Sequence, residues 1–324
     1  MTAQGLPWAV AFLAIVGCGR APEKAAPAPL VCNGNSELCS RPYDAVAYPG
    51  THDSYADTSE NFAAPDQTYP VARQLEDGIR VLHFEVHDDD GGIFACHSLC
   101  EIGEERLTEE MTSVADFMQG HPSEVVTLLL ERSDTLVTAN QIGEAMSSVG
   151  LEPYLRTQAP GEPWPTLGEM IDGGERLVAL LDNPDGGTYP WLLPRWNWTW
   201  ETPWQNEVPL DFGRCNADRG TQGNSLYVVD TYLEDVPIES AAHQALINYD
   251  PFLIDRFLYC QQTEHTLPNF VMVDFYEASD VFHVVEVLNG FAAPPASIQG
   301  FPPSVFIDGG GVEVADGGLN DGGS

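Results

Sequence analysis

The chain has 324 residues, enough for one large domain or two ordinary ones. Because 43% of the residues are hydrophobic and 10% aromatic, the composition excludes a disordered chain and allows a sizeable core. With 49 acidic against 13 basic residues, the formal net charge is -36, which repels nucleic acid. Solubility in a salty or extracellular setting is a more ordinary cause of such acidity. We expect no nucleic-acid partner, and a monomer.

Residues 1–18 resemble a targeting segment. The apolar run LPWAVAFLAIVGC ends at Cys18 and is too short to span a bilayer comfortably. Its last four residues, IVGC, resemble a bacterial lipobox, in which the cysteine is acylated after cleavage. No Lys or Arg precedes Cys18, which is atypical, so an ordinary cleaved signal and a retained segment stay open. We expect a protein of the cell envelope, lipid-anchored at Cys18, or an extracellular one.

Three further segments follow along the chain. Residues 19–31 are an Ala/Pro-rich tether, residues 32–307 form the folded domain, and residues 308–324 are a Gly/Asp-rich tail that we expect to be disordered.

If Cys18 carries lipid, six cysteines remain. An even number in an exported protein suggests disulfides, although six cysteines allow fifteen connectivities. We expect the shortest closures, Cys32–Cys39 and Cys96–Cys100, which leave Cys215–Cys260 as a long-range bond. A zinc site is the competing interpretation, but the paired CxxC spacing that it requires is absent.

Strand-like and helix-like segments alternate between the tether and the tail. Strands are expected at Tyr43–Tyr48, Ile79–His87, Ile93–Cys96, Glu124–Leu130, Arg176–Leu181, Leu226–Asp230 and Phe270–Phe275. Helices are expected in TYPVARQLEDG, which ends on Gly78, in TEEMTSVADFMQG, with Thr108 as N-cap and Gly120 at its end, in NQIGEAMSSVG, in Ser240–Gln261 and in DVFHVVEVLNG.

Repeated β-α units imply a parallel sheet, either doubly wound or closed as a barrel. No Gly-rich phosphate loop follows the first strand, which weakens a nucleotide-binding fold. We predict an α/β fold, a (β/α)8 TIM-type barrel that is distorted or incomplete and carries disulfides. Seven strands are recognisable, and the eighth is expected within Glu152–Thr166 or Tyr189–Arg214.

The strand in GIRVLHFEVHDDD alternates between two faces. Leu82, Phe84 and Val86 share one face, and His83, Glu85 and His87 share the other. A polar inward face suits a barrel that lines an active site, although an open sheet with one wet face gives the same pattern. Arg80 has the parity of the apolar face, which indicates a structural role.

Titratable residues recur where the expected strands end. His52 and Asp53 follow the first strand, Glu85 and His87 close the second, and His97 and Glu131 close the next two. In a parallel barrel these ends converge on one mouth, where active sites lie. The set therefore predicts an active site rather than surface decoration.

Three segments carry a resemblance to a known family: CNGNSELCSRPYDAVAYPGTHDSY, QLEDGIRVLHFEVHDDDGGIFACHSLC and MQGHPSEVVTLLLE. They resemble the X region of phosphatidylinositol-specific phospholipase C-like phosphodiesterases, closest to the secreted bacterial and fungal branch. The resemblance is dense from Cys32 to Glu131 and thins to ERLVALLDN, ETPW, NFVMVDFYE and VLNG.

The resemblance implies catalytic roles for two histidines. His52 corresponds to the general base or phosphate-binding histidine, and His97 to the general acid. Asp274 could orient a histidine from the last strand.

The same resemblance implies a metal site. Asp53 stands where calcium-dependent members carry an Asn ligand, Glu85 where they carry an Asp ligand, and Glu131 where they carry a Glu ligand. His83 stands where many members have an acidic residue, so one expected carboxylate is absent. Metal-independent members place an arginine at the position of Glu85, and this chain departs from that subgroup.

Charge balance gives a separate argument for calcium. Phosphodiester cleavage needs a base, an acid and positive charge on the phosphoryl oxygens. Nothing basic in the motifs supplies that charge, and Asp53, Glu85 and Glu131 would repel one another if brought together. A hard divalent cation with oxygen ligands resolves both problems, so we expect calcium as cofactor.

The resemblance thus predicts an exported phosphodiesterase that cleaves the glycerol–phosphate bond of phosphatidylinositol or a related phosphodiester. A glycerophosphodiester phosphodiesterase fits less well, because Asp53 rather than Arg follows His52 and the second strand lacks a paired Glu-x-Asp. A catalytically silent envelope lipoprotein that uses the barrel for binding also stays open.

The segment TYPWLLPRWNWTWETPW holds five of the seven tryptophans. They either form core beneath a long insertion or line a mouth rim that contacts a phospholipid surface or a headgroup.

Overall fold

The computed structural model of the protein describes residue 1 and residues 30–59, 62–89, 91–97, 100–133, 136–182, 188–234, 241–297, 301, 306–308 and 311–313. Within them, eight strands run parallel to their neighbours in the order β7-β6-β5-β2-β1-β11-β10-β8. Their bounds are β1 Tyr48–Thr51, β2 Val81–Asp89, β5 Val126–Arg132, β6 Leu177–Leu181, β7 Leu192–Pro194, β8 Thr199–Glu201, β10 Leu226–Thr231 and β11 Pro268–Val273.

The sheet is a barrel with one open seam. β7 ends the order on one side, and on the other side β9 (Arg219–Gly220) pairs antiparallel with β8. The described strands therefore do not close between β7 and β8. The predicted (β/α)8 barrel, incomplete and with disulfides, is confirmed.

The eighth parallel strand and one more come from the segment Tyr189–Arg214. β7 and β8 both lie there, whereas Glu152–Thr166 adds only two isolated bridges among the described residues, Leu155 with Leu177 and Thr166 with Pro42. The expected strand Ile93–Cys96 does form, as β3 (Gly92–Ala95), but it is antiparallel to β2 and outside the barrel order. Gly91 has φ 78 between the two strands, which suits a reversal of the chain. β4 (Glu105–Arg106) continues this hairpin.

The first strand begins later than predicted. Tyr43–Ala45 is a 3-10 turn, in which the amide of Tyr43 donates to the carbonyl of Pro165 rather than to a strand. The Pro49-Gly50 pair, expected to end the strand, lies inside β1. Gly50 is needed there, because a Cβ would meet Sδ of Met272 at 2.5 Å.

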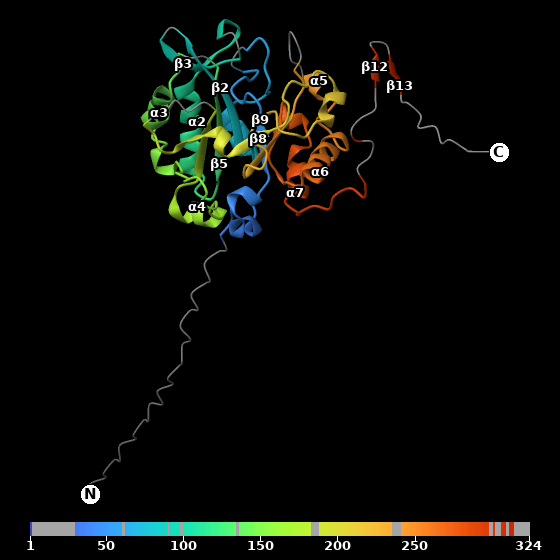
Figure 1. The fold of residues 1–324 in the computed structure, drawn as a ribbon. Coiled ribbons are helices and arrows are strands. Elements are labelled where there is room, and N and C mark those ends of the chain that lie inside the picture. The colour runs from blue at the N-terminus through green and yellow to red at the C-terminus, as the bar shows by residue number, and fades with distance from the viewer. Residues whose placement is uncertain are drawn as a thin grey trace, which may run out of the picture.

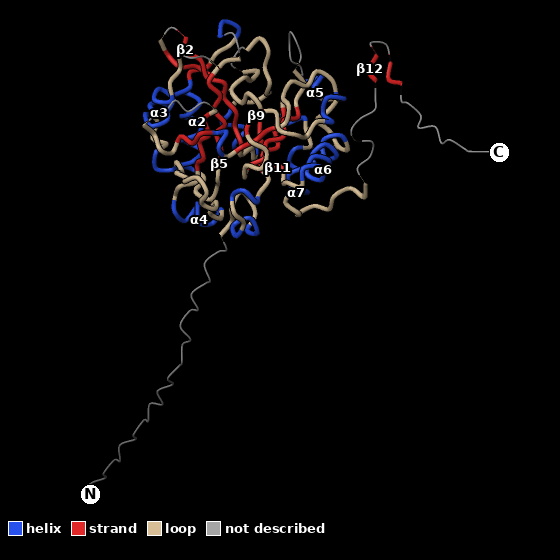
Figure 2. Tube along the Cα trace, in the orientation of Figure 1, coloured by secondary structure: helices blue, strands red, loops and turns tan. Residues whose placement is uncertain are grey.

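Helices cover the outside of the sheet, as Figure 2 shows. They are α1 Val71–Asp77, α2 Leu107–Gly120, α3 Ala139–Ser148, α4 Leu167–Gly173, α5 Ala241–Gln244, α6 Phe252–Glu264 and α7 Val281–Leu288. Short 3-10 turns also occupy Ser36–Ser40, Cys100–Ile102, Glu152–Tyr154, Arg195–Asn197, Pro209–Gly213 and Tyr276–Ala278.

Helix ends were predicted with mixed success. α1 ends as expected on Gly78, which adopts φ 114. α2 begins at Leu107, one residue before the expected N-cap Thr108, and its N-cap position is Arg106. Ser240–Gln261 contains two helices rather than one, since the chain turns before Pro251, a residue without an N–H to donate.

Alternation along the strands separates two apolar clusters. In β5, Leu128 and Leu130 pack toward the helices, while Leu129 belongs to the barrel interior. In β2, the interior face begins with apolar Val81 and continues with His83 and Glu85 toward the mouth. The interior is thus apolar at its base and polar at its mouth, as the sequence predicted for this strand.

Arg80 lies at the base and is structural, as its parity predicted. Its Nε donates to Glu124 Oε2 at 2.8 Å, and Nη1 donates to the carbonyls of Leu75 and Ile79. It therefore fixes α1 and the starts of two strands, far along β2 from the mouth.

All three expected disulfides form: Cys32–Cys39, Cys96–Cys100 and Cys215–Cys260. In Figure 1 the chain is coloured by residue number, and the Cys215–Cys260 bond joins the segment before β9 to α6.

Cys18 and most of the tether lie outside the described residues. In the predicted tail, β12 (Phe306–Asp308) pairs with β13 (Gly311–Glu313), and the other tail residues lie outside the description. None of the described helices has the length and apolar character needed to cross a bilayer.

Candidate active site

A cavity of about 120 Å³ opens at the carboxyl ends of the parallel strands. Every predicted strand-end residue except His87 lines it, together with His83, Trp204 of the tryptophan-rich segment and three residues that the sequence did not single out. The lining residues are His52, Asp53, His83, Glu85, His97, Glu131, Trp204, Arg219, Tyr232 and Glu234. Side chains from opposite sides of the barrel thus meet at one mouth, as predicted.

His52 directly follows β1 and is held by a carboxylate from the opposite end of the chain. Its Nδ1 lies 3.1 Å from Asp274 Oδ1, and its ring stacks on Tyr232 with centroids 3.8 Å apart. Asp274 also accepts from Gln244 Nε2 at 3.0 Å. Burial lowers the pKa of His52 to about 3, so the ring is neutral and can accept a proton at Nε2.

Asp53 connects two other histidines. Its Oδ1 lies 3.0 Å from His83 Nδ1, and its Oδ2 lies 3.1 Å from His97 Nδ1. Although burial opposes its charge, the nearby histidines hold the pKa of Asp53 well below its usual range. The residue adopts φ 34, a left-handed conformation that Asp tolerates better than most residues.

The pKa of His97 is shifted in the opposite direction from that of His52. The hydrogen bond to Asp53 and then the nearby Asp66 raise the pKa of His97 to about 12. Its ring is 33% exposed and lies 6.4 Å from the ring of His52, nearly perpendicular to it. One histidine is therefore a neutral acceptor and the other a charged donor, on the same cavity.

His83 lies between two of the predicted metal ligands. Its Nδ1 faces Asp53, and its Nε2 lies 3.6 Å from Glu131 Oε2. Burial disfavours the charged ring, but these two carboxylates outweigh it and raise the pKa of His83 to about 9.

Two arginines that the sequence did not predict reach the mouth. Arg219 Nη1 donates to Glu131 Oε1 at 2.9 Å, and Arg195 Nη1 lies 3.8 Å from Glu131 Oε2. Both guanidinium groups also pair with the buried Glu201. Although burial opposes its charge, His83 and Arg219 hold the pKa of Glu131 well below its usual range. The motifs themselves supply no basic residue to the site, as the sequence indicated, but these two arginines from beyond Glu131 do reach it.

Glu85 lies at the rim with His87. His87 Nε2 is 3.0 Å from Glu85 Oε1, and the hydroxyl of Ser133 donates to the same oxygen. Glu234 lies on the same cavity, and burial raises its pKa to about 7.

Asp66 was also missed. It is fully buried, 4.0 Å from His97 Nδ1, and burial raises its pKa to about 7. It follows no strand, so the strand-end pattern had no means of finding it.

The predicted calcium ligands share the cavity without converging on one point. Calcium takes about six to eight oxygen ligands around one ion. Among the described residues, the groups of ligand atoms within 4.8 Å of one another never combine Asp53 with Glu85 or Glu131. His83 lies between Asp53 and Glu131 instead. The side chains as placed do not fit a calcium ion, and calcium stays a prediction of the sequence.

The tryptophan-rich segment is mostly core. Trp191, Trp198 and Trp200 are buried, whereas Trp204 lines the cavity. Trp196 is half-buried and lies under the guanidinium of Arg195. Of the two alternatives for this segment, core applies to the first three tryptophans, and contact with a membrane surface stays a prediction.

Comparisons with known proteins agree with this geometry. The family model PI-PLC X 1 matches residues 38–289. A PI-PLC X domain-containing protein of the fungus Arthroderma benhamiae is 30% identical over 296 residues, which cover 81% of this chain and 90% of that protein. An uncharacterized secreted protein of the same fungus is 28% identical, over 80% of this chain and 64% of that protein.

Solved structures share the fold at low identity. The phosphatidylinositol-specific phospholipase C of Listeria monocytogenes superposes with a TM-score of 0.51 and 16% identity, covering 76% of this chain and 94% of that one. The Staphylococcus aureus enzyme gives 0.52 and 18%, over 78% and 94%.

Proposed function

The chain belongs to the PI-PLC X family, and from this premise we propose that it cleaves a phosphodiester by acid–base catalysis between His52 and His97. The observation that carries the proposal is the placement of two histidines on one cavity, each with its Nδ1 3.1 Å from a carboxyl oxygen, of Asp274 for His52 and of Asp53 for His97. Burial lowers the pKa of His52, whereas Asp53 raises that of His97. An enzyme that must both remove and deliver a proton needs such a pair.

The ring orientations assign the atoms. Asp274 holds Nδ1 of His52, which leaves Nε2 to take the proton of the attacking hydroxyl. Asp53 holds Nδ1 of His97, which leaves Nε2 to protonate the leaving alkoxide. When the hydroxyl is the substrate's own neighbour, one P–O bond forms as another breaks, and the product is a cyclic phosphate. His52 then carries the proton of the attacking hydroxyl, His97 has given its own proton to the leaving alkoxide, and exchange with water resets both.

The substrate we propose is phosphatidylinositol or a related phosphodiester. The relevant support is the family and the small polar cavity, which has room for a phosphate and a compact headgroup but not for acyl chains. An exported location is supported by the three disulfides and by the secreted relative.

A panel of phosphodiesters with different headgroups, soluble and in vesicles, tests the function. We expect cleavage of at least one inositol-containing diester, and His52→Ala and His97→Ala should each lower kcat about 100-fold or more. His283→Ala is the matched control, because this exposed histidine pairs with Asp250 away from the mouth. If no diester is cleaved, the barrel is a binding module; if either variant keeps normal turnover, that histidine has no part in the reaction.

A further inference from the structure

Binding of a phosphodiester anion presents this chain with an electrostatic difficulty. The formal net charge is -36, and four of the residues that line the cavity are carboxylates. An anion enters such a site only if fixed positive charge is close to its oxygens. The source of that charge decides whether the chain needs a metal ion.

The first feature is the position of His83. Its Nδ1 lies 3.0 Å from Asp53 Oδ1, and its Nε2 lies 3.6 Å from Glu131 Oε2. The ring therefore occupies the space between the two carboxylates that a shared divalent ion would have to fill.

The second feature is Arg219, which supplies positive charge at the mouth. Its Nε donates to Glu201 and its Nη1 to Glu131, while Nη2 has no partner among the described residues. The side chain is 29% exposed and lines the cavity that holds both catalytic histidines. Two donors are thus used for positioning, and a third remains for a ligand oxygen.

The surroundings of Arg219 hold the guanidinium in place. Its Cζ lies 5.3 Å from the ring centroid of Trp196 and 5.7 Å from that of Trp204. A cation between two aromatic rings is stabilised where it lies and loses little freedom on binding an anion.

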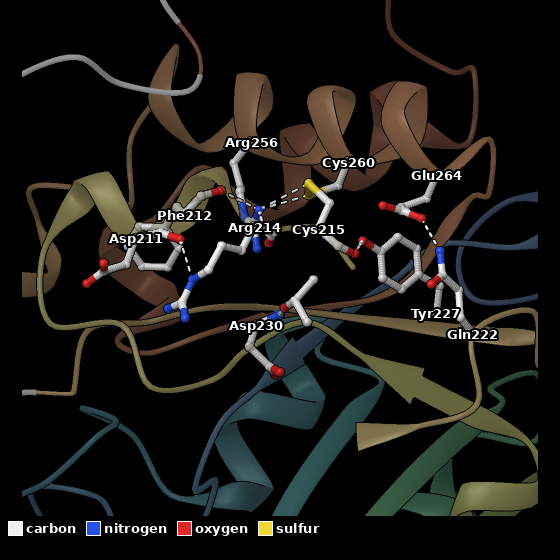
Figure 3. The surroundings of a disulfide bond; sticks show 11 residues. Asp211, Phe212, Arg214, Cys215, Gln222, Tyr227, Asp230, Arg256, Cys260 and Glu264 are labelled. Carbon is white, nitrogen blue, oxygen red and sulfur yellow. Dashed lines mark hydrogen bonds between the residues drawn. A yellow bond between two sulfur atoms is a disulfide. The ribbon is translucent and has the colours of Figure 1, made fainter. Parts of the chain in front are cut away.

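The backbone before Arg219 is fastened to α6, as Figure 3 shows. Cys215 is bonded to Cys260, and the hydroxyl of Tyr227 donates to the carbonyl of Cys215 at 2.7 Å. The buried Arg256 donates to the carbonyls of Phe212 and Arg214. The segment that delivers Arg219 is therefore a built part of the site rather than a free loop.

We propose that His83 fills the place of the divalent cation and Arg219 supplies the positive charge, so that the site binds and cleaves its phosphodiester without a metal ion. Arg219 donates from Nη2 to a non-bridging phosphoryl oxygen, and the ring of His83 holds Asp53 and Glu131 apart. The inference rests on the proposed function for the identity of the ligand, but its central claims concern binding and can be measured without turnover.

The first experiment is a calorimetric titration of the metal-free protein with calcium. We expect no binding at the mouth, and we expect His83→Glu to acquire a calcium site, because the substitution replaces the bridging ring by a carboxylate. Calcium binding to the unaltered protein that Glu131→Gln abolishes would overturn the proposal.

The second experiment is a titration with inorganic phosphate in the presence of chelator. Arg219→Gln should weaken binding about tenfold or more, and Arg219→Lys should restore only part of it, since a lysine lacks the fork that uses three donors at once. Arg73→Gln, the same charge change on the exposed face of α1, is the matched control. Unchanged phosphate affinity in folded Arg219→Gln protein would remove Arg219 from the site.

Turnover adds an independent outcome. Cleavage in excess chelator should equal cleavage without it, and Arg219→Gln should lower kcat/KM about 100-fold. Loss of cleavage in chelator with recovery in calcium would refute this inference and leave the proposed function intact. Absence of cleavage under every condition would refute the proposed function, and the two titrations would still decide the question of the cation.

Discussion

Asp53 controls the protonation of two histidines at once, because its two oxygens face His83 and His97. A single carboxylate in a left-handed turn after β1 therefore influences both His97, the proposed acid, and the His83 ring beside Glu131. The sequence identified Asp53 as a candidate ligand, but it could not show the direction of its side chain, which depends on contacts with residues 30 and 44 positions later.

The pH dependence of turnover should report this control. In the unaltered enzyme the pKa of His97 is about 12, so the acid stays protonated through neutral pH. In Asp53→Asn the largest cause of that shift is lost, and the pKa of His97 should fall toward its ordinary value near 6.5. Protonated acid is present below a pKa, so the variant alone should lose kcat/KM as the pH rises through neutrality.

The control for this prediction is Asp116→Asn, the same change on the exposed side of α2. Its pH–rate profile should match that of the unaltered enzyme. If kcat/KM of Asp53→Asn stays constant up to alkaline pH, Asp53 does not control the pKa of His97.

Among the elements, the long strands were predictable and the short ones were not. β2 and β5 have runs of alternating or continuous apolar residues, which indicate a strand without further context. β7 and β8 have three residues each and lie in a tryptophan-rich segment, where no period can be read. Arg195 lies in that segment and Arg219 in the two-residue strand β9 that follows it, and both were missed.

The Cys96–Cys100 disulfide belongs to the hairpin that carries His97. It closes a loop with a sequence separation of 4. For so short a loop, the lost entropy of the unfolded chain stabilises the fold by at most about 2 kcal/mol. Its main effect should be to fix the backbone at His97, since misplacement by about 1 Å can cost about 100-fold in rate. Replacing both cysteines by Ser should lower kcat about tenfold or more while moving the melting temperature by only a few degrees.

Cys32 and Cys39 provide the matched pair. Their bond also closes a short loop, with a separation of 7, but it lies in the barrel-interior apolar cluster on the base side. Replacing this pair should leave kcat per folded molecule unchanged. A large loss of stability with normal turnover in the Cys96/Cys100 variant would show that its bond is structural.

At the scale of the whole molecule, the negative net charge repels an anionic substrate as it approaches. An anionic diester approaches a chain with a formal net charge of -36, and salt screens this repulsion over a Debye length of about 10 Å at 0.1 M. Raising the salt concentration from low to moderate should therefore increase kcat/KM for a soluble anionic diester about severalfold, chiefly through KM. Sucrose of equal osmolarity is the control, and a fall in kcat/KM with salt would mean that local cations at the mouth dominate the approach.

The open seam between β7 and β8 has a consequence for how such a site can diversify. In a closed barrel each strand edge is bonded to a neighbour, so a change in one strand disturbs the next. Here the free edge of β8 accepts a two-residue strand, and that strand brings Arg219 to a mouth whose histidines come from the opposite wall. Headgroup preference can therefore be redesigned by grafting new hairpins after β8, with the acid–base pair left untouched.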